Sequence, residues 1–162
     1  MSKSWRFLAV AATASVAVLT TFASAALADA PKFHAATSSV SNTGAFVVSF
    51  DERGLGNTNI DYTLRADATA TYACINGGGN HPQAANKETV NGAVSASGSF
   101  EPKNGRVVAS LSGGPISAGS FSCPNGQRLV LAAVSYTNVV LTDTTNGVST
   151  SVANASRTFF AV

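Results

Sequence analysis

Two short stretches of the sequence gather the residues best suited to hold a ligand. They are Tyr72-Ala-Cys-Ile-Asn-Gly-Gly-Gly-Asn-His81 and Phe121-Ser-Cys-Pro-Asn-Gly-Gln-Arg128. In each stretch an aromatic residue precedes the cysteine by two positions, and Asn-Gly follows it by two. Amide and imidazole groups donate and accept hydrogen bonds, and a guanidinium group donates them, so these stretches form the candidate binding site, with plain turns that follow a disulfide as the alternative.

Cys74 and Cys123 are the only cysteines in the chain. Because the sequence predicts export to an oxidising compartment, we expect them to form an intramolecular disulfide, with free thiols or a shared metal as alternatives. Such a bridge would bring two loops together. The candidate binding residues on these loops are Asn76, Asn80, His81, Asn125, Gln127 and Arg128.

Catalytic motifs do not stand out in the sequence. No Gly-x-Ser-x-Gly elbow is present, and the three glycines before Asn80 do not lead into a Gly-Lys-Ser/Thr phosphate loop. We therefore predict no catalytic residues, no cofactor and no bound metal. A secreted hydrolase with His81 as its base is the enzymatic alternative. For the segment from Asp51 to Asp61, we expect a polar turn with Asp–Arg pairing, with a calcium site as the alternative.

The first residues predict a secretory signal peptide. Lys3 and Arg6 precede a segment without charges that ends in Ala26-Leu27-Ala28. A basic start, an apolar middle and an Ala-x-Ala cleavage site are the parts of such a signal. We expect cleavage after residue 28, with Ala25 or Ala30 as alternative positions and an uncleaved membrane anchor as the alternative to a signal. The mature protein is then secreted with no membrane attachment, with a loose lead-in at 29–44 and one domain at 45–162.

Removal of the signal takes away Lys3 and Arg6, which leaves eight basic residues against eight acidic ones. A chain without net charge, and without a cluster of basic residues, offers little attraction to nucleic acid. We therefore expect no nucleic-acid partner.

Alternation of apolar and polar residues dominates the rest of the chain. From Ile60 to Tyr72 every even position is apolar and every odd position is polar. This period of two is typical of a strand with one buried face, and it predicts that Tyr62 and Tyr72 point inward. Shorter segments repeat the pattern around residues 46–50, 94–100 and 107–111. Residues 128–141 are apolar on both faces in places, as in a central strand, residues 148–162 are expected to form a last strand or pair, and residues 83–90 have room for one helical turn at most. Short strands with turn signals between them predict an all-β antiparallel β-sandwich of Ig-like architecture.

Four stretches resemble a group of small secreted proteins of high-GC Gram-positive bacteria. They are residues 54–64, 72–82, 122–127 and 135–147, and the resemblance covers residues 45–162. The group has no assigned activity known to us, so the resemblance implies a bacterial secreted protein and assigns no site residue.

Together these features predict a secreted, non-catalytic binding module at the cell surface or in the medium. Its expected partner is a cell-wall component or an extracellular protein or glycan. An inhibitor of extracellular hydrolases, presenting the loop at 75–82, is the second hypothesis.

Overall fold

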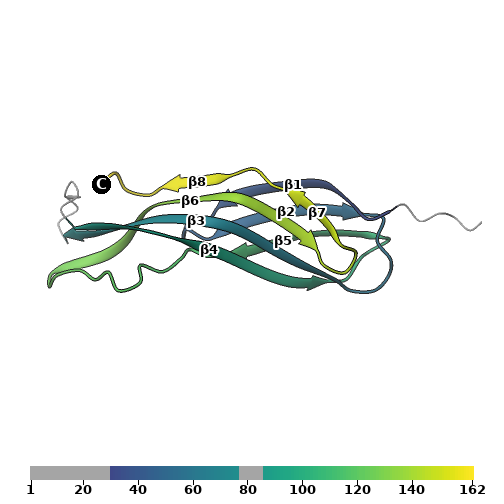
Figure 1. The fold of residues 1–162 in the computed structure, drawn as a ribbon, viewed down its shortest axis with the longest axis horizontal. Coiled ribbons are helices and arrows are strands. Elements are labelled where there is room, and N and C mark those ends of the chain that lie inside the picture. Colours follow the sequence, from purple (N-terminus) through teal and green to yellow (C-terminus); the bar gives the residue numbers. More distant parts are fainter. Residues whose placement is uncertain (1–29, 77–85) are drawn as a thin grey trace, which may run out of the picture.

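The computed structural model describes residues 30–76 and 86–162, which form two antiparallel sheets packed against each other (Figure 1). The predicted all-β sandwich with one disulfide is confirmed. The strands are β1 (Lys32–Val40), β2 (Phe46–Arg53), β3 (Ile60–Asn76), β4 (Lys87–Phe100), β5 (Arg106–Gly113), β6 (Gln127–Asp143), β7 (Val148–Ser151) and β8 (Ala155–Thr158).

The two sheets differ in length. The smaller sheet has the order β1-β2-β5, and the larger has the order β4-β3-β6-β7, with β8 also paired to β6. Strands β3 and β6 have 17 residues each, whereas β2 and β5 have eight. Figure 1 accordingly shows β1, β2 and β5 grouped toward one end of an elongated molecule, while β3, β4 and β6 continue to the other end.

The alternation of apolar and polar residues along β3 gives the strand one buried face and one exposed face, as predicted. Ile60, Tyr62 and Leu64 are buried, and the odd positions between Asp61 and Thr69 lie on the opposite, solvent-facing side. The inner face packs against the smaller sheet, where the rings of Phe50 and Tyr62 approach to 4.6 Å between centroids. Tyr72 is also directed inward but is only partly buried.

The expectation of a loose lead-in at 29–44 was wrong for most of that segment. Residues 32–40 form β1, which pairs with β2, so these residues are part of the sandwich and the domain does not begin at 45. The small polar residues of β1 hid its pattern, because only Phe33, Ala36 and Val40 contribute apolar contacts to the core. The possible helical turn at 83–90 is also absent over its described part, because β4 begins at Lys87.

The core contains an unusual group of polar side chains at the end where β2 finishes. Glu52 and Asp143 are fully buried, and Tyr62 is 1 % exposed. Asp143 accepts hydrogen bonds from the backbone and side-chain nitrogens of Asn146. Within the described part of the chain, both carboxyl oxygens of Glu52 and the hydroxyl of Tyr62 have no hydrogen-bond partner. Burial, with a smaller contribution from Asp143, raises the pKa of Glu52 to about 6, although the nearby Tyr62 hydroxyl acts in the opposite direction. Burial also raises the pKa of Tyr62.

Candidate functional site

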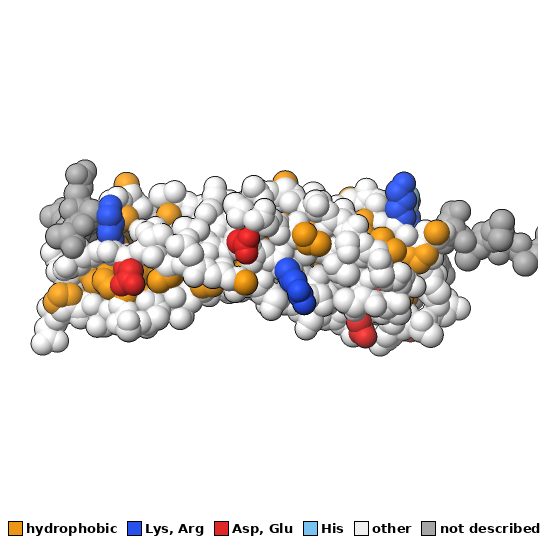
Figure 2. Space-filling view, in the orientation of Figure 1, with side chains coloured by type: hydrophobic (Ala, Val, Ile, Leu, Met, Phe, Trp, Pro, Cys, Tyr) orange, Lys and Arg blue, Asp and Glu red, His pale blue; other side chains and the backbone are white. Residues whose placement is uncertain are grey.

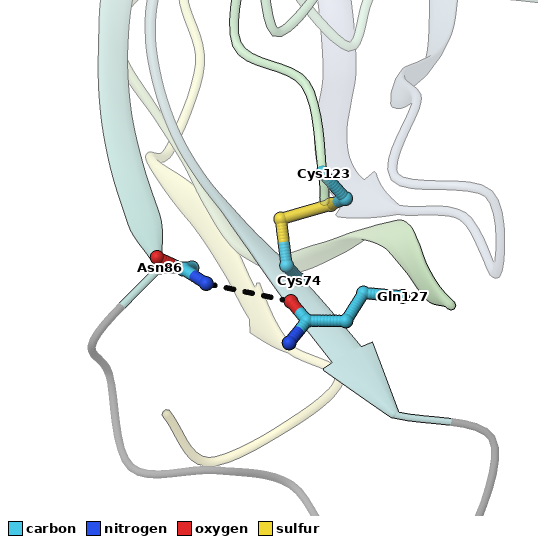
Figure 3. The surroundings of a disulfide bond; sticks show 4 residues. All are labelled: Cys74, Asn86, Cys123 and Gln127. Carbon is cyan, nitrogen blue, oxygen red and sulfur yellow. Dashed lines mark hydrogen bonds between the residues drawn. A yellow bond between two sulfur atoms is a disulfide. The ribbon is translucent and has the colours of Figure 1, made fainter. Parts of the chain in front are cut away.

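The predicted disulfide is present between Cys74 and Cys123, whose Cα atoms are 5.5 Å apart (Figure 3). Cys74 lies on the inner face of β3, but Cys123 lies in the irregular segment 114–126 and not at a strand end. The bridge therefore ties that segment to the part of the larger sheet that the smaller sheet does not reach. The Tyr72 hydroxyl adds a second tie by donating a hydrogen bond to the Ile116 carbonyl.

Part of the predicted binding site gathers around this bridge, in a region we call the stapled end (Cys74, Asn76, Cys123, Asn125, Gln127 and Arg128). Asn76 on β3 pairs with Gln127 on β6, and the Asn86 amide donates to the Gln127 side-chain oxygen over 3.4 Å (Figure 3). Asn125 and Arg128 are exposed. Asn80 and His81 lie outside the described residues, so both remain predictions.

Arg128 borders a small hollow at the stapled end. Its volume is about 320 Å³, and it lies between the turn at 42–43 and the C-terminal residues, with Leu131 and Phe159 in its wall. Arg128 has no hydrogen-bond or ion-pair partner among the described residues. An apolar wall with one cation beside it can hold a small ligand, but this hollow has few polar groups to orient one.

A larger hollow, which sequence reasoning missed, lies on the outer face of the larger sheet. Its volume is about 620 Å³. The polar side chains that line it are Thr63, Arg65 and Asp67 on β3, Ser95 and Ser97 on β4, and Asn138 on β6, and we call it the bulge hollow. Its remaining lining residues are alanines and one valine.

A break in strand pairing forms one side of the bulge hollow. Arg65 pairs with Val140 and Asp67 with Thr137, so β6 contains one residue more than β3 across this interval. Asn138 lies in this bulge with a φ of 51°, a conformation that asparagine tolerates better than most residues. Bulges re-aim side chains and are over-represented beside functional sites. The Asn138 side-chain nitrogen donates to a carboxylate oxygen of Asp67 over 2.8 Å.

The bulge hollow presents both hydrogen-bond donors and acceptors to solvent. Arg65 has no partner among the described residues, so its guanidinium is available to a ligand. Only one oxygen of Asp67 is engaged by Asn138. The hydroxyls of Ser95 and Ser97 add groups that donate and accept. With one cation and one anion, the polar lining has no net charge.

At the start of the segment from Asp51 to Asp61, Asp51 and Arg53 form an ion-pair cluster with Arg106 on the outer face of the smaller sheet. The Asp51 carboxylate accepts from Arg106 over 2.7 Å and from Arg53 over 2.9 Å, and these bonds hold its pKa well below the usual range. The predicted Asp–Arg pairing is therefore present. Among the residues that the structure describes, no group of three or more His, Cys, Asp or Glu side chains is placed to hold a metal ion.

Within the described ranges, no helix has the length and hydropathy needed to cross a membrane. Comparison of the chain with protein-family models, with curated proteins and with solved structures finds no match.

Proposed function

We propose that the protein is a secreted, non-catalytic binding module that attaches to material at the cell surface or in the medium. The observation that supports this function most directly is the bulge hollow. It combines a volume of about 620 Å³, a bulge that directs Asn138 into it, and unpaired donor and acceptor groups. These features suit the recognition of a polar ligand.

Secretion is part of the proposal. The signal-like sequence at 1–28 lies outside the described residues, and its support is the basic, apolar and Ala-x-Ala pattern of the sequence. A disulfide between Cys74 and Cys123 is compatible with an oxidising compartment.

The surface is also compatible with attachment by hydrogen bonding. Figure 2 shows isolated Lys, Arg, Asp and Glu side chains separated by wide uncharged areas. On the outer face of the larger sheet, neighbouring strands carry paired hydroxyl and amide side chains, such as Thr69 with Asn91 and Thr142 with Ser149. Such groups hydrogen-bond to polar partners without the long-range attraction that charge provides.

The experiment that tests the proposed function is cosedimentation. The purified mature protein would be mixed with Gram-positive cell walls and with insoluble polysaccharides, and the pelleted fraction measured against a folded β-sandwich protein of similar size. We expect pelleting with at least one matrix that saturates as protein is added. A protein that stays in the supernatant with every matrix would contradict the proposal.

A further inference from the structure

We propose that the bulge hollow is a binding site for an uncharged polysaccharide, which lies along β3 on the outer face of the larger sheet. This inference rests on the proposed function and specifies the site and the class of ligand.

The first argument is the chemistry of the lining. Sugar hydroxyls donate and accept hydrogen bonds, and so do the hydroxyls of Thr63, Ser95 and Ser97. The planar guanidinium of Arg65 provides several parallel donors, which suit adjacent hydroxyls on one ring. Asp67, oriented by Asn138, retains one free acceptor oxygen beside them.

The second argument is charge. Arg65 and Asp67 are two residues apart on the same face of β3, and they balance each other. A polyanion attracted by Arg65 would be repelled by Asp67, whereas an uncharged ligand can hydrogen-bond to both. The described lining residues include no aromatic side chain, a type enriched among the residues that contribute most to binding in protein interfaces, so a protein partner is disfavoured.

The third argument is the shape of the outer face. A second hollow, of about 360 Å³, lies on the same face. Three threonines, Thr71, Thr89 and Thr158, line it together with Lys87 and the apolar residues Ala133, Phe160, Ala161 and Val162. Asp67 and Thr71 are four residues apart, a distance of about 13 Å along the strand. Between the hollows, the Thr69 hydroxyl donates to the Asn91 side-chain oxygen over 2.6 Å. Two hollows on one face, with polar side chains between them, fit an extended polymer better than a small molecule.

Two variants test the site directly. Arg65→Gln removes the guanidinium, and Asn138→Gly removes the amide while keeping a residue that tolerates positive φ. We expect each to weaken pelleting with amorphous cellulose, chitin or β-1,3-glucan particles about tenfold, the effect of losing one hydrogen bond that involves a charged group. The assay would use whichever of these three uncharged polymers the unaltered protein binds.

Matched controls exist elsewhere on the surface. Arg53→Gln makes the same change on the outer face of the smaller sheet, and Asn104→Gly makes the same change at another asparagine with positive φ, 53°. Both should bind as the unaltered protein does. Pelleting should also be equal at low and high salt, because salt screens attraction between charges and leaves hydrogen bonding to an uncharged polymer largely intact.

Four results would overturn this inference. Binding to cell walls but to none of the uncharged polymers, or binding abolished by high salt, would refute the ligand class and leave the proposed function standing. Full binding by Arg65→Gln and Asn138→Gly, together with loss in Arg128→Gln, would move the site to the stapled end. Pelleting with no matrix at all would refute the proposed function as well.

Discussion

The two faces of β3 contrast sharply although they belong to one strand. The inner face carries Tyr62 and Leu64, both fully buried against the smaller sheet. The outer face carries Arg65 and Asp67, which have much of their hydrogen-bonding capacity free. Since alternate residues point to opposite faces, changes on one face should affect stability and changes on the other should affect binding. The following predictions test this separation.

The largest expected effect on stability comes from removing the disulfide, which is attached to the inner face of β3 near its C-terminal end. Cys74 and Cys123 are separated by 49 positions. A loop of this size stabilises the folded state by about 4 kcal/mol in the chain-entropy model. We expect the double variant Cys74→Ser, Cys123→Ser to lose about this much free energy of unfolding, as measured by urea denaturation. An unchanged unfolding midpoint would show that the bridge does not support the overhanging part of the larger sheet.

A substitution that leaves a cavity on the inner face of β3 should have the next largest effect on stability. Leu64 is 2 % exposed and belongs to the core cluster. Replacing a buried leucine by alanine costs about 2–5 kcal/mol, so we expect Leu64→Ala to unfold at a clearly lower denaturant concentration. A loss below about 1 kcal/mol would mean that the two sheets are packed less tightly here than the structure indicates.

The buried carboxyl group should make stability depend on pH. Because burial raises the pKa of Glu52 to about 6, from 4.5, the folded state holds its proton more tightly than the unfolded state does. This contribution is complete below pH 4.5 and is lost as the pH rises through about 6, a change of about 2 kcal/mol. Glu52→Gln should remove that part of the pH dependence and raise stability at neutral pH relative to the unaltered protein.

The measurement for Glu52 is urea denaturation across the range from pH 4 to pH 8. Glu101→Gln is the control, since it changes the same residue type at an exposed position. Parallel pH profiles for the unaltered protein and Glu52→Gln would show that the Glu52 carboxyl is not responsible.

We expect the smallest effect on stability from a substitution on the outer face of β3. Arg65 is exposed and has no partner among the described residues, so Arg65→Gln should change the free energy of unfolding by less than about 0.5 kcal/mol. Urea denaturation of the same preparation used for cosedimentation checks this value. Marked destabilisation would mean that any loss of binding by this variant reflects damage to the fold.

The sequence predicts the fold better than it predicts the site. Strict alternation along β3 identified its buried face, because each inner position is apolar. The sequence does not predict β1, because small polar residues interrupt its alternation. The strand is stabilised by pairing with β2, which the sequence pattern does not show. The Ig-like comparison stays a prediction.

The bulge hollow could not be read from sequence for a different reason. Arg65 and Asp67 look like ordinary solvent-facing residues of a strand, and Asn138 stands in a run of strand-forming residues. Only the pairing register reveals that β6 has an extra residue there and that Asn138 meets Asp67. The two cysteines, in contrast, are the only ones in the sequence, which made their pairing predictable. For this reason the sequence predicted a candidate site at the stapled end.

The most direct test of a polysaccharide site in the bulge hollow is an NMR titration of the isotope-labelled protein. The ligand is a soluble fragment of the uncharged polysaccharide with which the protein pellets. If the ligand binds in the bulge hollow, we expect the chemical-shift changes to concentrate at residues 63–67, 93–97 and 137–140, on the outer face of the larger sheet. The stapled end is about 20 Å away from Asp67 along β3, so the two regions are easily distinguished. Changes concentrated at residues 125–131, with none around Arg65 and Asn138, would contradict the account.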